Sequence, residues 1–153
     1  MRTLHVDGLN FTFPDAWDVS KYDEWSFYRN HFIKLCNGLK AVDVVALSPE
    51  KAAYLIEVKD YRHPQTEKPS FLADAIAMKV LHTLAVFLPA KFNASEGERS
   101  ISEKLLKCDK LNIVVHIEQC ARPRACYELC SVRAKPRVEF ADAPQALPNR
   151  RQR

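Results

Sequence analysis

Apolar and polar residues alternate along residues 4–13, on either side of Gly8, and the pattern stops at Pro14. Alternation with a period of two, interrupted by glycine, is typical of two short strands joined by a tight turn. The sequence therefore predicts a β-hairpin near the start of the chain.

Helical spacing follows this hairpin. Four large apolar residues recur at intervals of three or four and would share one helix face: Trp25, Tyr28, Phe32 and Leu35. Ser20 followed by Asp23 is similar to a capping box, and Asn37-Gly38 is a typical helix end. We therefore predict a helix over about residues 20–37, with its aromatic face toward the core.

Two apolar runs, residues 41–47 and 53–58, flank the turn signal Ser48-Pro49-Glu50-Lys51. Both are rich in β-branched residues, and the second continues toward Tyr61. The turn is short enough for the two runs to form an antiparallel hairpin.

A polar loop precedes Ser70, which could cap a helix running to about Leu88 and ended by Pro89. Ser100 and Glu103 have the spacing of a capping box, which predicts a second helix to about Cys108. Together these patterns place two helices after the strand pair.

The apolar run over residues 111–117 is typical of a central strand buried on both faces. Pro123 could open another short helix, and residues 138–140 could form a last strand. The predicted fold class is therefore α/β, with a mixed sheet flanked by helices.

A chain of 153 residues with 47 % hydrophobic residues fits one domain, which we expect to span residues 1–141. Residues 142–153 are basic and rich in proline, as in a loose tail. The longest apolar run, residues 75–90, contains Lys79 and His82, so it is expected to be a core helix and not a membrane span. The N-terminus has no apolar signal region, so we expect a cytoplasmic protein without membrane contact.

Charge is unevenly distributed along the chain. The net charge is +4, yet residues 122–153 alone carry eight basic and three acidic residues. A basic end of this kind is typical of proteins that bind polyanions, and it is also typical of solvated tails.

Five cysteines are present, and an intracellular setting favours free thiols. His116 and Cys120 are four residues apart and could belong to a zinc site with the nearby cysteines. The alternative is that Cys126 and Cys130, one helical turn apart, face the core.

The candidate catalytic residues are charged residues inside the apolar strand pair. Glu57 and Lys59 share one face of their strand because side chains alternate, while Ile56 and Val58 point to the other face. Asp43, on the partner strand, would bring a second carboxylate close to Glu57. Two such carboxylates repel each other unless a cation lies between them.

Asp43 and Glu57 offer the hard oxygen ligands that suit Mg²⁺ or Mn²⁺, with a backbone carbonyl near Val58 as a further ligand. Lys59 could orient or deprotonate a water, or neutralise charge on a phosphate. The alternative is a hairpin with an ordinary salt bridge at its edge.

This pattern of an aspartate, a turn and Glu-x-Lys on the next strand resembles the PD-(D/E)XK nuclease superfamily, which includes restriction endonucleases and Holliday-junction resolvases. The resemblance covers about residues 18–118, with Asp43, Glu57 and Lys59 at the motif positions. Val42 stands where the family has proline. The resemblance implies a restriction-endonuclease-like core of αβββαβ type.

Many members also have an acidic residue on the helix before the motif, and here Glu24 is the best candidate and Asp23 the other. Many have a polar residue on the helix after the motif, where Lys79 and His82 share one face. The alternative for all four is a solvated helix surface.

Arg62 and His63 could contact phosphate at the mouth of the site, whereas Asp60 points away from Lys59. The resemblance implies a metal-dependent nuclease acting on DNA. So small a domain would take its specificity from a homodimer or a partner protein. An RNA nuclease and a catalytically silent binding or assembly module remain alternatives.

Overall fold

A computed structural model describes residues 1–62 and 69–119 of the chain. In chain order the elements are β1 (Arg2–Val6), β2 (Leu9–Phe13), β3 (Asp18–Lys21), η1 (Tyr22–Glu24), α1 (Ser26–His31), η2 (Leu35–Asn37), β4 (Val44–Leu47), β5 (Ala52–Asp60), α2 (Leu72–Asn93), α3 (Glu96–Leu105) and β6 (Lys110–Glu118). The predicted helix at Pro123, the strand over residues 138–140 and the tail over residues 142–153 lie outside the described residues.

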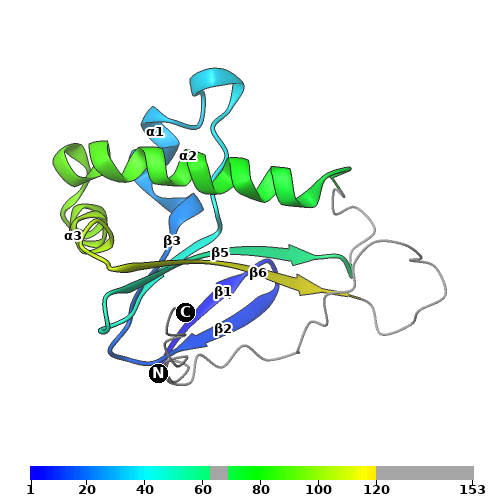
Figure 1. Cartoon of the computed structure of the whole chain (residues 1–153), viewed down its shortest axis with the longest axis horizontal. Helices are drawn as coiled ribbons and strands as arrows, with labels where there is room; N and C mark the ends of the chain where they lie inside the picture. Colours follow the sequence, from blue (N-terminus) through cyan, green and yellow to red (C-terminus); the bar gives the residue numbers. More distant parts are fainter. Residues whose placement is uncertain (63–68, 120–153) are drawn as a thin grey trace, which may run out of the picture.

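Four strands form one mixed sheet in the order β3-β4-β5-β6 (Figure 1). β3 pairs with β4 and β4 with β5 in antiparallel fashion, while β5 and β6 are parallel. The predicted hairpin between the two apolar runs is confirmed. The chain reaches β6 by way of α2 and α3, because a parallel partner requires a long crossover.

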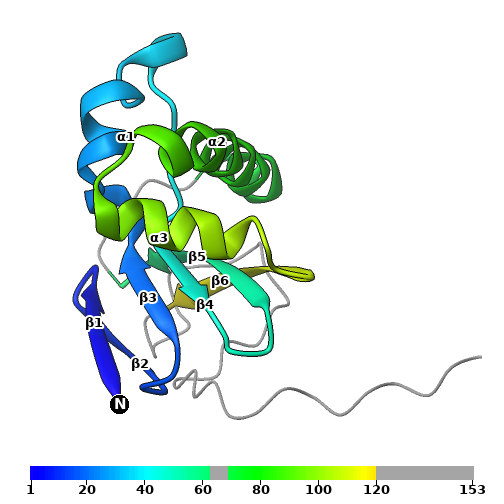
Figure 2. The same ribbon diagram turned by 90° about the vertical axis from the view of Figure 1, so that its left-hand side faces the viewer.

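The three helices cover one face of this sheet, and the β1–β2 hairpin lies against the other (Figures 1 and 2). The core on the helix side contains aromatic residues of η1 and α1 together with Val45, Leu55 and Phe87. The core on the hairpin side joins Phe13 to residues such as Ile56. The mixed α/β sheet with helices is therefore confirmed, and β5 is strongly apolar because both of its faces are covered.

The hairpin turn explains the early alternation. Asp7 and Gly8 have φ values of 48° and 78°, which is the left-handed backbone that two-residue hairpin turns require. The predicted hairpin over residues 4–13 is confirmed, with Arg2 paired to Phe13.

The predicted helix over residues 20–37 is wrong in its bounds, because the segment begins as β3 and continues as the short elements η1, α1 and η2. Ser20 belongs to β3, where it pairs with Val45 and does not cap a helix. Its Oγ accepts a hydrogen bond of 2.7 Å from Trp25 Nε1. Backbone pairing with β4 thus overrides the helical pattern, α1 is short, and Leu35 is 48 % exposed.

Pro89 lies inside α2 and does not end it as predicted. Proline removes the hydrogen bond to the carbonyl four residues earlier, which belongs to the exposed Ala85 and is therefore open to water. Asn93 Nδ2 donates to the Pro89 carbonyl at 3.1 Å in the last turn.

The second helix of the pair begins earlier than its expected start. Ser95 and Glu98 form the capping box of α3, not Ser100 and Glu103. Glu98 Oε1 also accepts the backbone N–H of Ser26 at 2.6 Å and its hydroxyl at 3.1 Å. One carboxylate therefore serves the N-termini of both α1 and α3.

β6 is an edge strand among the described residues, not the central strand that was predicted. Val114 and Val115 pack partly against the two cores, but Leu111 and Ile113 are 47 % and 54 % exposed. The apolar run therefore reflects the parallel pairing with β5 more than burial on both faces.

By length and composition, α2 is the one helix within residues 1–62 and 69–119 that could cross a membrane. With 22 residues, α2 is longer than the apolar run over residues 75–90 from which a core helix was predicted. Its inner face nevertheless packs on the sheet through buried residues such as Val80, Thr83 and Phe87. The packing is that of a core helix with one exposed apolar side.

Candidate active site

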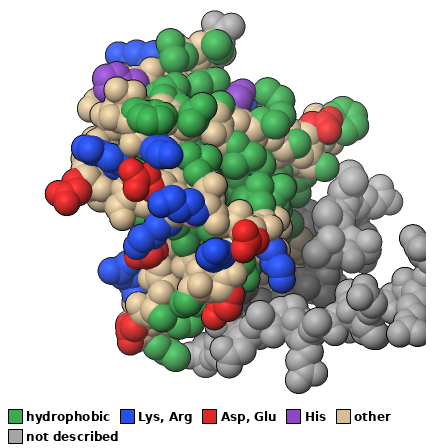
Figure 3. All heavy atoms as spheres, turned by 60° about the vertical axis from the view of Figure 1, so that its left-hand side comes forward, with side chains coloured by type: hydrophobic (Ala, Val, Ile, Leu, Met, Phe, Trp, Pro, Cys, Tyr) green, Lys and Arg blue, Asp and Glu red, His purple; other side chains and the backbone are tan. Residues whose placement is uncertain are grey.

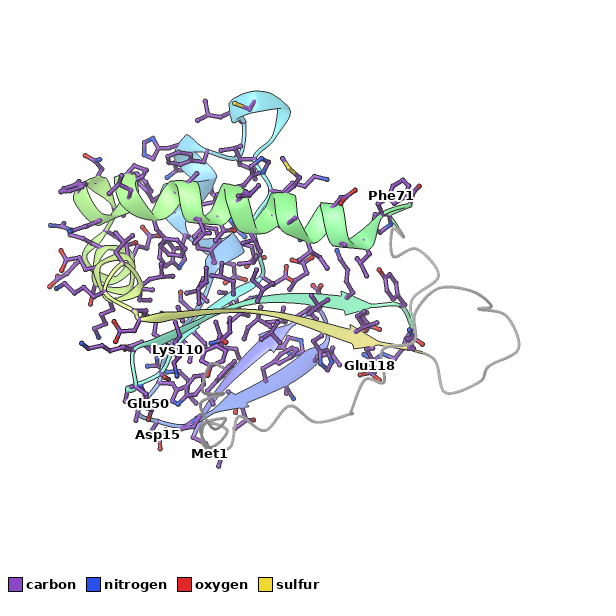
Figure 4. All side chains as sticks on the ribbon, viewed as in Figure 1. Met1, Asp15, Glu50, Phe71, Lys110 and Glu118 are labelled. Atoms are coloured by element: carbon purple, nitrogen blue, oxygen red, sulfur yellow. The ribbon has the colours of Figure 1, made fainter. Side chains whose placement is uncertain are left out.

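Glu57 and Lys59 lie on the helix side of β5, as their spacing predicts. Lys59 Nζ is 3.0 Å from Glu57 Oε1, and the Glu57 side chain is only 1 % exposed. Ile56 and Val58 point into the core on the hairpin side. The alternation of β5 therefore aims a buried carboxylate and an ammonium group at α2, and Figure 4 shows side chains filling the layer between β5 and this helix.

Asp43 lies immediately before β4 and is held by the backbone of β5. Its N–H donates to the Ile56 carbonyl at 3.1 Å, and its Oδ2 accepts the Val58 N–H at 2.6 Å. Its own carbonyl accepts the Tyr22 N–H at 2.9 Å. These contacts fix the second carboxylate beside Glu57.

α2 contributes a second ammonium group. Lys79 Nζ donates to Glu57 Oε1 at 2.6 Å and lies 4.0 Å from Asp43 Oδ1. One turn further along, Thr83 Oγ1 accepts the Val42 N–H at 3.1 Å. The helix thus supplies a charge to the site and anchors the backbone next to Asp43.

The environment of the site disfavours two ionised carboxylates side by side. Burial raises the pKa of Asp43 to about 7, and the Glu57 charge adds to the rise, while the Val58 N–H and Lys79 act against it. Burial alone would lower the pKa of Lys59, but its contact with Glu57 outweighs this and raises the pKa.

Glu57 has one oxygen that still needs a partner. Oε1 receives both lysines, whereas Oε2 is buried and has no hydrogen-bond partner among the described residues. A buried carboxylate oxygen without a donor is costly. Together with the repulsion from Asp43, it makes the two-carboxylate set suitable for a divalent cation.

The described residues contain no group of three or more His, Cys, Asp or Glu side chains that could hold a metal ion. At this site, the acidic side chains that the described residues offer to a cation are those of Asp43 and Glu57. Backbone carbonyls, water or a substrate phosphate would supply the others, as is usual for Mg²⁺.

The structure does not bring Glu24 to these residues. Its carboxylate is exposed and pairs with Lys21 at 2.5 Å, and this contact lowers its pKa. Asp23, the alternative, has a buried Oδ1 without a partner among the described residues. Burial raises the pKa of Asp23, and the charge of Asp7 in the hairpin turn raises it further, as it does for Asp43.

Two of the residues expected to contact nucleic acid make hydrogen bonds within the fold. Arg62 donates to the Asp60 carboxylate from its backbone N–H at 3.0 Å, from Nε at 2.9 Å and from Nη2 at 2.6 Å. His82 Nδ1 accepts the Lys40 N–H at 3.0 Å and is therefore engaged in holding the segment before β4. His63 lies outside the described residues.

The alternative zinc site cannot be followed, because Cys120, Cys126 and Cys130 lie outside the described residues. His116 is 8 % exposed and packs edge-on against Phe11, with the ring centroids 5.1 Å apart. Its Nε2 lies 3.6 Å from a Glu118 oxygen.

Sequence reasoning missed two contributors to the site. Thr83 carries no charge that would mark it as a site residue, although its position four residues after Lys79 places it on the same helix face. Asp7 lies in a predicted turn and therefore gave no functional signal in the sequence. Only the packing of the hairpin against the sheet brings its charge near Asp43.

Comparison with known proteins gives one informative similarity. The chain is 34 % identical over 149 residues to a cysteine–tRNA ligase of Neisseria meningitidis serogroup A, in an alignment that covers 77 % of this chain and 21 % of the ligase. The chain thus spans about a fifth of the length of the curated relative it matches. No protein-family model and no solved structure matches the chain.

Proposed function

We propose that this protein is a metal-dependent nuclease of the PD-(D/E)XK type that hydrolyses phosphodiester bonds, with DNA as its substrate. One observation carries the proposal. Asp43 and Glu57 meet at a buried point of the sheet with Lys59 and Lys79 beside them, and one Glu57 oxygen has no donor within residues 1–62 and 69–119. An ordinary salt bridge does not require the second carboxylate.

The fold supports a restriction-endonuclease-like core. Glu57 lies on an antiparallel strand pair and Asp43 immediately before it, a long helix packs over them, and the chain then returns as a strand parallel to β5. α1 lies between β3 and β4, so its place differs from that of the first helix in an αβββαβ order.

Asp43 and Glu57 would hold a Mg²⁺ or Mn²⁺ ion, which when bound supplies a water of lowered pKa and positive charge near the phosphate. Lys59 would orient the attacking water or neutralise charge that develops on the phosphate. Lys79 holds Glu57 in place through its 2.6 Å hydrogen bond. With the cation bound, its ammonium would be available to a phosphate oxygen.

The similarity to a cysteine–tRNA ligase favours a second candidate. In this second candidate function, the chain acts on or binds RNA, tRNA in particular. It would be either an RNA nuclease or a catalytically silent binding module with the same fold. A cytoplasmic location suits either candidate. The two candidates differ in substrate and share the Asp43–Glu57 site.

The test uses the full chain and a panel of linear duplex, plasmid, branched and single-stranded DNA, mixed RNA and tRNA. Each substrate is incubated with Mg²⁺, with Mn²⁺ or with EDTA. We expect metal-dependent cleavage that is lost in Asp43→Asn and Lys59→Met and retained in the control Glu24→Gln, whose carboxylate is exposed and pairs with Lys21.

Each outcome separates the candidates. Cleavage of duplex DNA supports the first and cleavage of tRNA alone supports the second. A folded protein that binds Mn²⁺ and tRNA but cuts no substrate would establish the silent module. Equal activity in all the variants would show that Asp43 and Lys59 do not form the active site.

A further inference from the structure

The outer face of α2 is an apolar stripe. Five large hydrophobic side chains on or next to this helix are 46–73 % exposed: Phe71, Met78, Leu81, Leu88 and Phe92. They account for nearly half of the large hydrophobic residues that are exposed within residues 1–62 and 69–119. Figure 3 shows hydrophobic side chains gathered in a continuous band on this face, with most charges grouped beside it.

The stripe has the spacing of a helix-pairing seam. Alternating steps of three and four place these residues on one line, with Asp74 and Ala85 filling the remaining positions. An interval that averages 3.5 residues is the pattern by which two helices pack along their lengths. From Ala77 to Phe92, no charged residue is among the exposed positions of α2.

The area of the stripe is sufficient for a specific dimer. A large apolar side chain exposes roughly 200 Å² when fully free, so the exposed fractions of these five residues leave about 600 Å² on each copy. Two copies would bury about 1,200 Å², the lower limit for stable and specific interfaces.

Charged residues at the two ends of the stripe favour one relative orientation of the paired helices. Asp74 is the acidic residue in the first turn of α2, and Lys91 is the basic residue in its last turn. Lys91 Nζ lies 5.5 Å from the Phe92 ring centroid, which places it at the margin of the stripe. Only an antiparallel pair of helices brings Asp74 of one copy near Lys91 of the other.

We propose that the outer face of α2 binds a second copy of this chain, with the two α2 helices antiparallel and Leu81 close to the twofold axis. A closed twofold arrangement uses the same patch on both copies, as this stripe permits. The proposal is independent of the nuclease assignment, because its test measures mass and not cleavage.

A membrane is the less suitable occupant. The face of α2 opposite the stripe is committed to the protein, since Lys79 bonds to Glu57 and Thr83 accepts the Val42 N–H. The helix could therefore not cross a bilayer without opening the site. It also lacks the row of basic residues that surface-bound helices use to hold anionic lipids.

Sedimentation velocity of the full chain over a wide concentration range tests the proposal. We expect wild-type protein to change from its monomer mass of 17.5 kDa to twice that value as concentration rises. Leu81→Asp should raise the dissociation constant at least about 100-fold, because it buries a carboxylate. Leu35→Asp is the matched control, since Leu35 is a leucine 48 % exposed and outside α2.

Charge reversal tests the direction of the helices. Asp74→Lys and Lys91→Glu should each weaken the dimer about tenfold, and the double variant should restore it. Circular dichroism and thermal unfolding establish that each variant is folded.

Three results would overturn the proposal: wild-type protein that remains at 17.5 kDa at every concentration, a dimer equally sensitive to the two leucine variants, or a double charge variant no better than the singles. Monomeric protein that sediments with phosphatidylcholine–phosphatidylglycerol vesicles would assign the stripe to lipid instead.

Discussion

Lys79 on α2 and Glu57 on β5 form a hydrogen bond of 2.6 Å although they are 22 residues apart in the sequence. Glu57 is 1 % exposed and Lys79 is 21 % exposed, so water contributes little to solvating the carboxylate. The long helix is thereby tied to the strand whose carboxylate it covers. Lys59 on the same strand binds the same Glu57 oxygen.

Replacement of Lys79 by methionine should lower the free energy of unfolding by about 2 kcal/mol in EDTA, because a buried carboxylate loses a charged donor. Urea unfolding followed by circular dichroism measures the loss. Lys104→Met is the control, since its ion pair with Asp18 has a similar length, 2.7 Å, but both side chains are about half exposed. That variant should lose less than about 0.5 kcal/mol. Equal losses would show that burial does not strengthen the Lys79 contact.

Asp43 should make the protein less stable as pH rises. Its folded pKa, about 7, is above the unfolded value, so the folded state binds the extra proton between these values. The carboxyl group is therefore tolerated best below about pH 4, and stability is lost as pH rises toward 7. The full effect is at most about 4 kcal/mol.

The measurement is urea unfolding at pH 5 and pH 8 in EDTA. Asp43→Asn keeps an oxygen for the Val58 N–H and carries no charge, so it should gain stability at pH 8 relative to wild type and lose this part of the pH dependence. A variant that is less stable than wild type at pH 8 would contradict the assignment of repulsion to this residue.

Thr83 should matter for stability more than its small side chain suggests. Thr83→Val leaves the buried Val42 N–H without its acceptor, which should cost about 1–3 kcal/mol. Thr12→Val, on the exposed side of the hairpin, is the matched control and should be close to neutral because valine suits a strand. Thermal unfolding of both variants measures the difference, and similar melting temperatures would argue against the Thr83 anchor.

Glu98→Ala should destabilise the protein by about 1–2 kcal/mol, since its carboxylate caps α3 and accepts two hydrogen bonds from Ser26 at the start of α1. Glu103→Ala serves as the control, because Glu103 is an acid within the same helix and caps neither N-terminus. Chemical unfolding of the two variants is the measurement. If Glu103→Ala were the more damaging, the helix would begin at Ser100, as the sequence pattern suggested.

Local patterns predicted the strands well and the first helix poorly, and the reason is physical. The hairpin over residues 4–13 and the pair β4–β5 are closed by short turns, so neighbouring residues determine them. Ser20 and Trp25 fit a helix locally, but the segment before Tyr22 pairs with β4, a partner that no local pattern reveals. The pairing with β4 therefore determines the structure of that segment, and local propensity does not.

The core of the candidate site could be predicted because its residues come from two adjacent strands and one helix with clear periodicity. Glu57 and Lys59 follow from strand alternation, and Lys79 from its helix face. Glu24 was preferred over Asp23, and the two differ by one position, so a small change in backbone rotation decides which one is buried. The structure buries part of Asp23 and exposes Glu24.

The parallel pairing of β5 with β6 also predicts an order of folding. Partners in the β4–β5 hairpin, such as Leu47 and Ala53, are close in sequence, whereas Ala52 and Lys110 meet only after α2 and α3 are in place. Contacts between distant residues form late. Asp43 and Glu57 should thus approach each other before Lys79 arrives. We therefore expect refolding to be faster at mildly acidic pH. A proton on Asp43 then removes the repulsion from Glu57 before the Lys79 ammonium is in place.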